Sequence, residues 1–249
     1  MAEAATELLY LTKMDDAYAR EFDARIVKRG DNYVVLDRTL FYPEGGGQEF
    51  DTGILRYPGG TSTVVRVEKK GIVKHVLDAL PPPDVESVHG VVDWDRRHAH
   101  MRMHTSQHLI SGLVYDLFGG VRTVGNQIHA ERSRIDFRPA KFTDEDLQRI
   151  EAETNAVLAR KLAVRIVWEA RSDLEKRVKP DRANLDLLPA SVQNLRVIEI
   201  DGMDACPCGG THVRNLGEIG RVRILGKSSK GAETVRIEYE LEPAGATVA

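Results

Sequence analysis

Two pairs of residues with metal-binding side chains stand out in the sequence. His104 and His108 are four residues apart, and Cys208 and His212 have the same spacing about a hundred residues later. On a helix, two histidines at this spacing project from one face about one turn apart. Imidazole nitrogens and thiolates are ligands that zinc prefers. The sequence therefore predicts a zinc site of three histidines and one cysteine.

Other interpretations of these residues remain open. The histidine pair could be two hydrogen-bonded side chains on a polar helix face. No glutamate follows His104, so the helix of zinc peptidases, in which that glutamate is the general base, does not fit. Cys206 is a possible substitute for Cys208 as a ligand, but a role behind the ligands, or no role at the site, is the preferred interpretation. Asp201 and Asp204 are candidates to orient an imidazole from behind, as metal-bound histidines usually require, or belong to a solvated turn.

The second part of the chain must contain the elements that position these ligands. Leucines four residues apart at 109, 113 and 117 predict a helix over residues 102–118. A capping box at residues 143–146 predicts the start of an amphipathic helix. Strands are expected at residues 164–168, 195–200, 221–225 and 234–241.

The first part of the chain has short alternating or β-branched apolar runs separated by glycine-rich turns. These runs predict strands at residues 24–27, 33–36, 54–57, 63–67 and 72–77, forming a small β-barrel or sandwich. Three prolines at residues 81–83 predict a linker or long loop. We therefore expect an α+β protein with a small N-terminal β-barrel domain over residues 1–90 and a C-terminal α+β zinc domain over residues 91–249.

Composition narrows the class of protein. Apolar residues make up 42% and charged residues 29% of the 249 residues, which is typical of a folded globular chain and excludes disorder. The net charge is −3, with five excess acidic residues before residue 94 and two excess basic residues after it. A polyanionic partner would therefore be expected to contact the second part of the chain, residues 94–249. Without a membrane-spanning run or a signal peptide, the protein is expected to be soluble and cytoplasmic.

The two motifs resemble a known family. His-Thr-Ser-Gln-His at 104–108 followed by Cys-Gly-Gly-Thr-His at 208–212 is similar to the editing domain of alanyl-tRNA synthetase and to its free-standing relatives, the AlaX trans-editing proteins. The segment 36–48 resembles the Gly-rich part of the domain that precedes the editing core. The resemblance covers residues 8–241 and indicates the longer AlaX type, which keeps the Gly-rich N-terminal domain. Threonyl-tRNA synthetases have a related zinc domain, but these motifs favour the alanine system, and Cys206 departs from the pattern.

This resemblance implies a zinc-dependent hydrolase that deacylates mischarged Ser-tRNA(Ala) and also Gly-tRNA(Ala). The implied cofactor is Zn²⁺ and the implied partner is mischarged tRNA for alanine, with no membrane partner. The expected metal ligands are His104, His108, Cys208 and His212. A catalytic role is expected for Gln48, Thr123 and Gln127, and substrate binding for Gly45, Gly46, Gly47, Thr39 and Arg134.

Two of these expectations have a physical basis. Serine can be selected over alanine only by polar partners of its hydroxyl, which Thr39, Thr123, Asn126 and Gln127 could provide. Three successive glycines are conformationally costly, so they indicate either a tight turn, which needs only one or two, or the close approach of another group. The family resemblance favours the second interpretation and implies that their backbone approaches the zinc site.

Basic side chains are candidates for phosphate contacts, about half of which should prove to be surface or ion-pair residues: Arg96, Arg97, Arg102, Arg132, Arg134, Arg138, Lys141, Arg221, Arg223 and Lys227.

The sequence leaves several points open. The zinc could activate water or hold the substrate's amino group, and because four ligands would close its shell, one of them, taken to be His212, is expected to be displaced. The chain could instead be a zinc-containing tRNA-binding module without hydrolytic activity, or a zinc hydrolase of small esters. Monomer and dimer are both possible.

Overall fold

The computed structural model describes residues 5–242. The chain divides into two compact units, Met1–His100 and Met101–Ala249, and the division falls within helix α2 (Trp94–Leu117). The boundary that the sequence predicts, after residue 90, lies inside a barrel strand, β8 (Ser87–Val92), which belongs to the first unit. Helix α2 begins earlier than the leucine spacing predicts because Asp93 accepts a hydrogen bond from the backbone of Arg96 at 3.2 Å and so caps the helix start.

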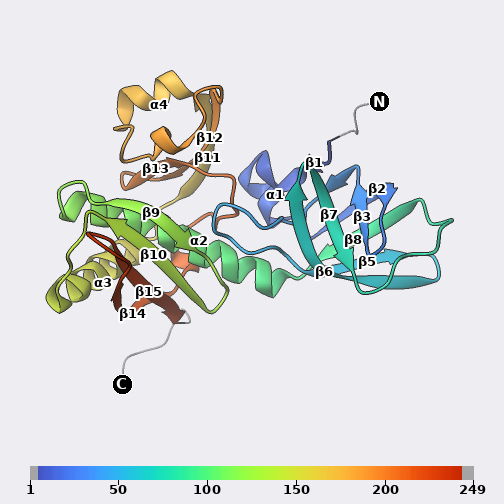
Figure 1. Ribbon diagram of the computed structural model, residues 1–249, viewed down its shortest axis with the longest axis horizontal. Coiled ribbons are helices and arrows are strands. Elements are labelled where there is room, and N and C mark those ends of the chain that lie inside the picture. Colours follow the sequence, from blue (N-terminus) through green and yellow to red (C-terminus); the bar gives the residue numbers. More distant parts are fainter. Residues whose placement is uncertain (1–4, 243–249) are drawn as a thin grey trace. The chain divides into compact units, whose positions relative to one another are not determined.

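The first unit is built around a closed six-stranded barrel, which confirms the barrel prediction. Its strands follow the order β2-β3-β7-β6-β5-β8 (Figure 1). Glycine allows the missed strand β8 to pass close to β2, because a Cβ at Gly90 would lie 2.3 Å from the Phe22 ring. The elements of this unit are β1 (Glu7–Leu8), α1 (Met14–Tyr18), β2 (Glu21–Arg29), β3 (Tyr33–Leu36), β4 (Arg38–Thr39), β5 (Gly53–Tyr57), β6 (Gly60–Lys70), β7 (Ile72–Leu77) and β8.

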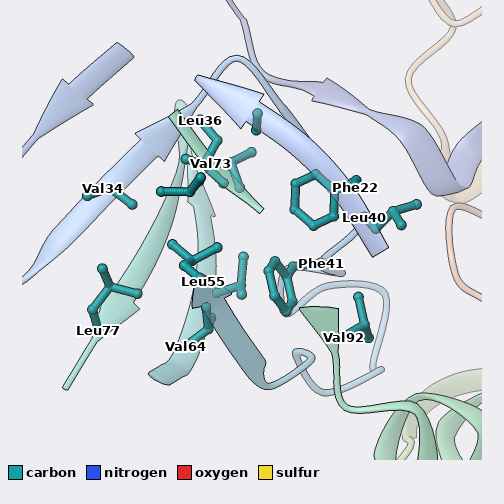
Figure 2. Close-up of a cluster of buried hydrophobic side chains, with 13 residues drawn as sticks. Phe22, Val34, Leu36, Leu40, Phe41, Leu55, Val64, Val73, Leu77 and Val92 are labelled. Atoms are coloured by element: carbon teal, nitrogen blue, oxygen red, sulfur yellow. The ribbon is translucent and has the colours of Figure 1, made fainter. Parts of the chain in front are cut away.

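Alternating side chains of the barrel strands form its apolar core. Figure 2 shows Phe22, Leu36, Phe41 and Leu55 turned toward the barrel interior. The strands alternate buried and exposed positions, as a half-buried strand requires. This alternation is why the sequence pattern located these strands.

The three prolines lie in the loop between β7 and β8 of the barrel, so of the two expected alternatives, a linker or a long loop, the structure has the loop. Arg29 holds this loop by donating hydrogen bonds to the carbonyl oxygens of Pro81 at 2.9 Å, Pro82 at 3.1 Å and Val85 at 2.5 Å. Proline removes backbone donors but leaves these acceptors available. The three prolines predict the loop from the sequence, but nothing in the sequence indicates that Arg29 binds it.

A buried ion pair joins the first turn of α2 to the barrel unit. Arg97 and Asp51 are both fully buried, and Arg97 Nε lies 2.9 Å from Asp51 Oδ2. The guanidinium also donates to the carbonyl oxygens of Ala17 at 3.0 Å and Leu40 at 2.5 Å. Asp51 accepts from the backbone of Tyr42 at 2.7 Å. Arg97 is therefore a structural residue, and it belongs to those phosphate-contact candidates that prove to be ion-pair residues.

Replacing Asp51 with alanine should destabilise the protein by about 3–5 kcal/mol, because a buried guanidinium would lose its counter-charge. Equilibrium unfolding in urea measures this change. Glu44→Gln is the matched control, since the Glu44–Arg66 pair is half exposed and should contribute less than about 1 kcal/mol. Equal losses in the two variants would contradict the structural role of the buried pair.

The second unit combines helices with two antiparallel sheets, as an α+β protein requires. The four-stranded sheet has the order β14-β15-β10-β9 and the three-stranded sheet the order β11-β12-β13 (Figure 1). Thr143 caps α3 in the predicted capping box. The remaining elements are β9 (Arg122–Gln127), β10 (Arg132–Arg138), α3 (Asp144–Ala159), β11 (Val164–Ala170), α4 (Arg171–Arg177), β12 (Asn194–Ile200), β13 (Asp204–Pro207), β14 (Arg221–Ser229) and β15 (Val235–Glu242).

Helix α4 covers one face of the three-stranded sheet. Leu174 of the helix belongs to an apolar cluster with Leu195 and Val197 of β12 and Ala205 of β13. Residues next to these in each strand must point to the opposite face of the sheet. None of the described helices is long and apolar enough to cross a membrane.

Candidate metal centre

The two predicted ligand pairs come together in the second unit. His104 and His108 project from one face of α2, where they are 2% and 5% exposed, and their ring centroids are 5.3 Å apart. Cys208 directly follows β13, and His212 ends the Gly-rich loop after it. The His212 ring centroid lies 4.4 Å from that of His104 and 4.9 Å from that of His108. A regular helix and a folded loop thus supply two ligands each.

The spacing of the donor atoms suits one zinc ion. Cys208 Sγ lies 3.6 Å from His104 Nε2 and 3.4 Å from His212 Nε2. Two ligands of a tetrahedral zinc ion are about 3.3–3.7 Å apart, given bond lengths near 2.0–2.3 Å. One donor atom from each of the four residues lies within 4.8 Å of the others. The chemistry and spacing of this set therefore fit the expected cofactor.

Two of the imidazoles are oriented by partners on their far side. The Thr105 hydroxyl donates to the carbonyl oxygen of Met101 at 2.8 Å, so it accepts from His212 Nδ1, which lies 3.2 Å away. Asp204 Oδ2 lies 3.4 Å from His108 Nδ1. Each contact leaves Nε2 directed toward the cluster, which is how metal-bound histidines are usually held.

The charges inside the cluster favour a thiolate. Burial raises the pKa of the Cys208 thiol, but the imidazoles of His104 and His212 outweigh it and hold that pKa well below the usual range. Burial lowers the pKa of His108, but Asp204 and the Cys208 sulfur outweigh it and raise it to about 10. The thiolate is the form of cysteine that binds a metal.

Residues beside Cys208 fix its position. The backbone amide of Gly210 points at Cys208 Sγ at 3.3 Å, and the backbone amide of Cys208 donates to the carbonyl oxygen of Arg196 at 3.0 Å. The buried Arg196 side chain in turn donates to the carbonyl oxygen of Cys208. Arg196 therefore holds the peptide of the cysteine ligand from two directions.

The structure also shows the partners of Cys206, Asp201 and His212, for which the sequence suggested roles at the metal site. The Cys206 thiol contacts the carbonyl oxygen of Ala183 at 3.6 Å, outside the ligand cluster, and burial raises its pKa. Asp201 pairs with Arg165 and not with an imidazole. His212 is fully buried and bonded to Thr105, and its displacement by substrate stays a prediction.

A polar chain extends along α2 from the metal cluster. Ser111 is one turn beyond His108 on the same helix face. The Ser111 Oγ accepts hydrogen bonds from Gln107 Nε2 and from Thr123 Oγ1, both at 2.7 Å. Thr123, on β9, was named from the sequence, whereas the two helix residues that hold it were missed.

Other residues named from the sequence have intramolecular partners. Arg134 donates to Gln127 Oε1 at 2.8 Å across β9 and β10. Thr39 is fully buried in the first unit, where its hydroxyl lies 2.9 Å from His75 Nε2 and accepts from the backbone of Phe41 at 3.0 Å. Since burial lowers the pKa of His75 to about 4, this contact is between neutral groups at physiological pH. Because Thr39 is fully buried and its hydroxyl is bonded within the first unit, we leave Thr39 out of the substrate site.

The glycine-rich segment forms a two-residue hairpin turn. Gly45 and Gln48 exchange backbone hydrogen bonds of 2.9 and 3.1 Å, and Gly46 and Gly47 between them have φ values of 56° and 86°. Positive φ at both central positions requires glycine or a similar residue. Turn geometry thus explains Gly46 and Gly47 but leaves Gly45, whose φ is outside this region, unexplained.

Most basic side chains that were candidates for phosphate contacts have protein partners. Arg102 donates to the carbonyl oxygen of Ile219 at 3.0 Å. Acidic side chains pair with Arg96, Arg97, Arg132, Arg221, Arg223 and Lys227. These pairs confirm that many of the basic residues balance local acidic charge.

Comparison with known proteins gives this site a class. A family model described as "Threonyl and Alanyl tRNA synthetase second additional domain" matches residues 195–238, which include Cys208 and His212, and "tRNA synthetases class II (A)" matches residues 5–96. Both models describe domains of tRNA synthetases, and this is the class of protein to which the two units of the chain are similar.

Full-length relatives define the family more closely. Alanyl-tRNA editing protein AlaX-M of Methanosarcina barkeri is 35% identical over 95% of this chain and 99% of its own length, and that of Methanosarcina mazei is 34% identical over 95% and 96%. Alanine–tRNA ligase of Thermococcus kodakarensis is 38% identical over 85% of this chain, which spans only 23% of that relative. The chain belongs to the AlaX family of alanyl-tRNA editing proteins.

Proposed function

We propose that this protein edits alanyl-tRNA by hydrolysing the ester bond of Ser-tRNA(Ala), and of Gly-tRNA(Ala), in the cytoplasm. The observation that carries the proposal is the cluster of three buried histidines and one half-buried cysteine in a chain whose full-length relatives are alanyl-tRNA editing proteins. Removing serine or glycine attached in error serves the accuracy of translation.

The four cluster residues would hold the zinc ion that this activity requires. A zinc ion of this kind lowers the pKa of a bound water and polarises a carbonyl group. Thr105 and Asp204 keep the imidazole rings of His212 and His108 in place, and Arg196 fixes the peptide of Cys208. These contacts preorganise the site before substrate arrives.

We assign recognition of the serine hydroxyl to Thr123. Its hydroxyl donates to Ser111, which lies on the helix face of the metal ligands, and so Thr123 Oγ1 retains free lone pairs that can accept from a substrate hydroxyl. Gln127 is the second candidate on β9, and Arg134 holds its side-chain oxygen, which leaves its amide group available as a donor. An alanyl ester lacks the serine hydroxyl and would leave the Thr123 hydroxyl without this hydrogen-bond partner.

We assign binding of the acceptor end of the tRNA to the turn of Gly45–Gln48. Gly45→Leu should raise KM for mischarged tRNA several-fold while zinc content and thermal stability stay the same, because a Cβ there would meet its nearest atom, Tyr42 Oη, at 3.8 Å and φ imposes no strain. Gly46 is unsuitable for this test, since a branched side chain at its positive φ is itself destabilising. An unchanged KM in Gly45→Leu would show that the glycines only form the turn and do not contact the tRNA.

One assay tests the proposed function. Deacylation of Ser-, Gly- and Ala-tRNA(Ala) is measured with the zinc-loaded protein and again after treatment with a chelator. We expect hydrolysis of the serine and glycine esters, its loss with chelator and its return when zinc is added. Binding of tRNA without hydrolysis would indicate a tRNA-binding module, and salt-insensitive hydrolysis of small esters alone would indicate a different substrate class.

A further inference from the structure

An exposed tryptophan lies in the same cross-strand row as the cysteine ligand. Trp168 of β11 is directly opposite Arg196 of β12. Val197 is paired with Pro207, and the backbone amide of Cys208 donates to the carbonyl oxygen of Arg196, so Arg196 is in turn opposite Cys208. Residues directly opposite in an antiparallel sheet point to the same face. Trp168, Arg196 and Cys208 therefore form one row on the face that carries the thiolate.

The row runs from an exposed rim to the buried centre. Neighbouring strands are about 4.8 Å apart, so Trp168 starts about 10 Å from Cys208. Trp168 is 48% exposed, whereas Arg196 is 7% exposed and Ile198, the next residue on this face of β12, is fully buried. A large aromatic ring is thus exposed to solvent on β11, beside the buried side chains that β12 contributes to the same face.

We propose that Trp168 is a stacking platform for an unpaired nucleobase at the single-stranded 3′ end of the tRNA. This inference rests on the proposed function, because the ester to be cleaved belongs to the ribose of the terminal nucleotide. A base must then lie about one nucleotide's length from the metal centre. Bases of single-stranded RNA are commonly bound by stacking on aromatic side chains. On the face of β11–β13 that carries Cys208, Trp168 is the aromatic residue.

Arg196 is a positioning residue in this arrangement. It lies between Trp168 and Cys208 in the row, and its side chain donates to the carbonyl oxygen of Cys208. The backbone carbonyl of the same arginine accepts from the Cys208 amide at 3.0 Å. The strand that carries the platform is therefore linked directly, through one residue, to the peptide of the metal ligand.

The first test compares steady-state kinetics on Ser-tRNA(Ala) for Trp168→Ala, Trp168→Phe and the wild type. Losing one stacked base should raise KM about 5- to 150-fold, with kcat within twofold. Trp168→Phe keeps a ring and should recover most of the affinity. Leu187→Ala is the matched control, since Leu187 is an exposed apolar residue of the same unit that lies outside the row. Its KM should not change.

The second test observes stacking without catalysis. A tRNA(Ala) transcript whose terminal adenine is replaced by 2-aminopurine should lose fluorescence when it binds the wild-type protein and should not lose it with Trp168→Ala. Unchanged KM and equal quenching in Trp168→Ala would overturn the platform while leaving the deacylase function intact. A wild-type protein that cleaves no mischarged tRNA would overturn the proposed function, whatever the fluorescence shows.

If Trp168→Ala loses zinc or unfolds, a second variant still tests the proposal. In that case Trp168→Leu, which keeps an apolar side chain but no ring, takes the place of Trp168→Ala. The platform predicts the same rise in KM and the same loss of quenching for Trp168→Leu, with zinc content unchanged. Wild-type affinity in this variant would overturn the proposal, because apolar contact alone would then suffice.

Discussion

Replacing Cys208 with alanine is expected to remove the metal and to lower deacylation of Ser-tRNA(Ala) by about 10³-fold or more. Cys208 Sγ lies within 3.6 Å of two imidazole nitrogens and supplies the negative charge of the site. A catalytic zinc ion contributes several kcal/mol of transition-state stabilisation, and each 1.36 kcal/mol corresponds to a factor of ten in rate. Zinc content by elemental analysis and single-turnover deacylation measure the two effects on the same sample.

Cys206→Ala is the matched control for this variant. Its thiol contacts the carbonyl oxygen of Ala183 outside the ligand cluster, so the variant should keep one zinc ion per chain and full turnover. If Cys208→Ala retained its zinc and its rate, while Cys206→Ala lost both, the assignment of the two cysteines would be reversed.

The wild-type protein should hydrolyse Ser-tRNA(Ala) about 10⁴-fold faster than Ala-tRNA(Ala), compared as kcat/KM. A site built to bond a hydroxyl can discriminate by 10⁴ or more, because the analogue without it leaves buried polar groups unpaired, whereas apolar contacts worth one methylene give only about 10–200-fold. The chain that joins Thr123, Ser111 and Gln107 supplies such polar groups.

Thr123→Val tests the origin of this discrimination, since valine keeps the shape of threonine and removes its hydroxyl. The variant should cleave the serine ester about 10²-fold more slowly or worse, with little change for the alanine ester and no loss of zinc. Similar rates on the two esters in the wild type would argue against proofreading, since such an enzyme would also drain correctly charged tRNA.

The metal cluster could be predicted because each half of it is local in sequence. A helix places His104 and His108 on one face, and a Gly-rich loop brings Cys208 and His212 together, so spacing alone reveals both halves. The contacts that orient the rings could not be predicted in the same way. The bond between Thr105 and His212 joins residues 107 positions apart, and no periodicity in the sequence indicates which threonine meets which imidazole.

The fold shows the same division between local and distant information. Alternation predicted the barrel strands, and the capping box predicted the start of α3 at Thr143. Strand β8 was missed because its Gly90 interrupts the apolar pattern, and the reason for that glycine, the Phe22 ring, is distant in sequence. Charge alone could not distinguish the buried Arg97 from the half-buried Arg96 beside it, because Asp51, the partner of Arg97, is also distant along the chain.

The separation of the ligand pairs also sets an order of events during synthesis. Ribosomes add about 5–20 residues per second, so Cys208 emerges roughly 5–20 s after His108. During that interval the nascent chain offers only two of the four cluster residues, His104 and His108, because Cys208 has not yet been added. Strands β11–β13 pair in the segment that leads to Cys208. A metal ion that needs all four donors could therefore bind only after Cys208 and His212 have emerged, when the residues of the barrel have already left the ribosome.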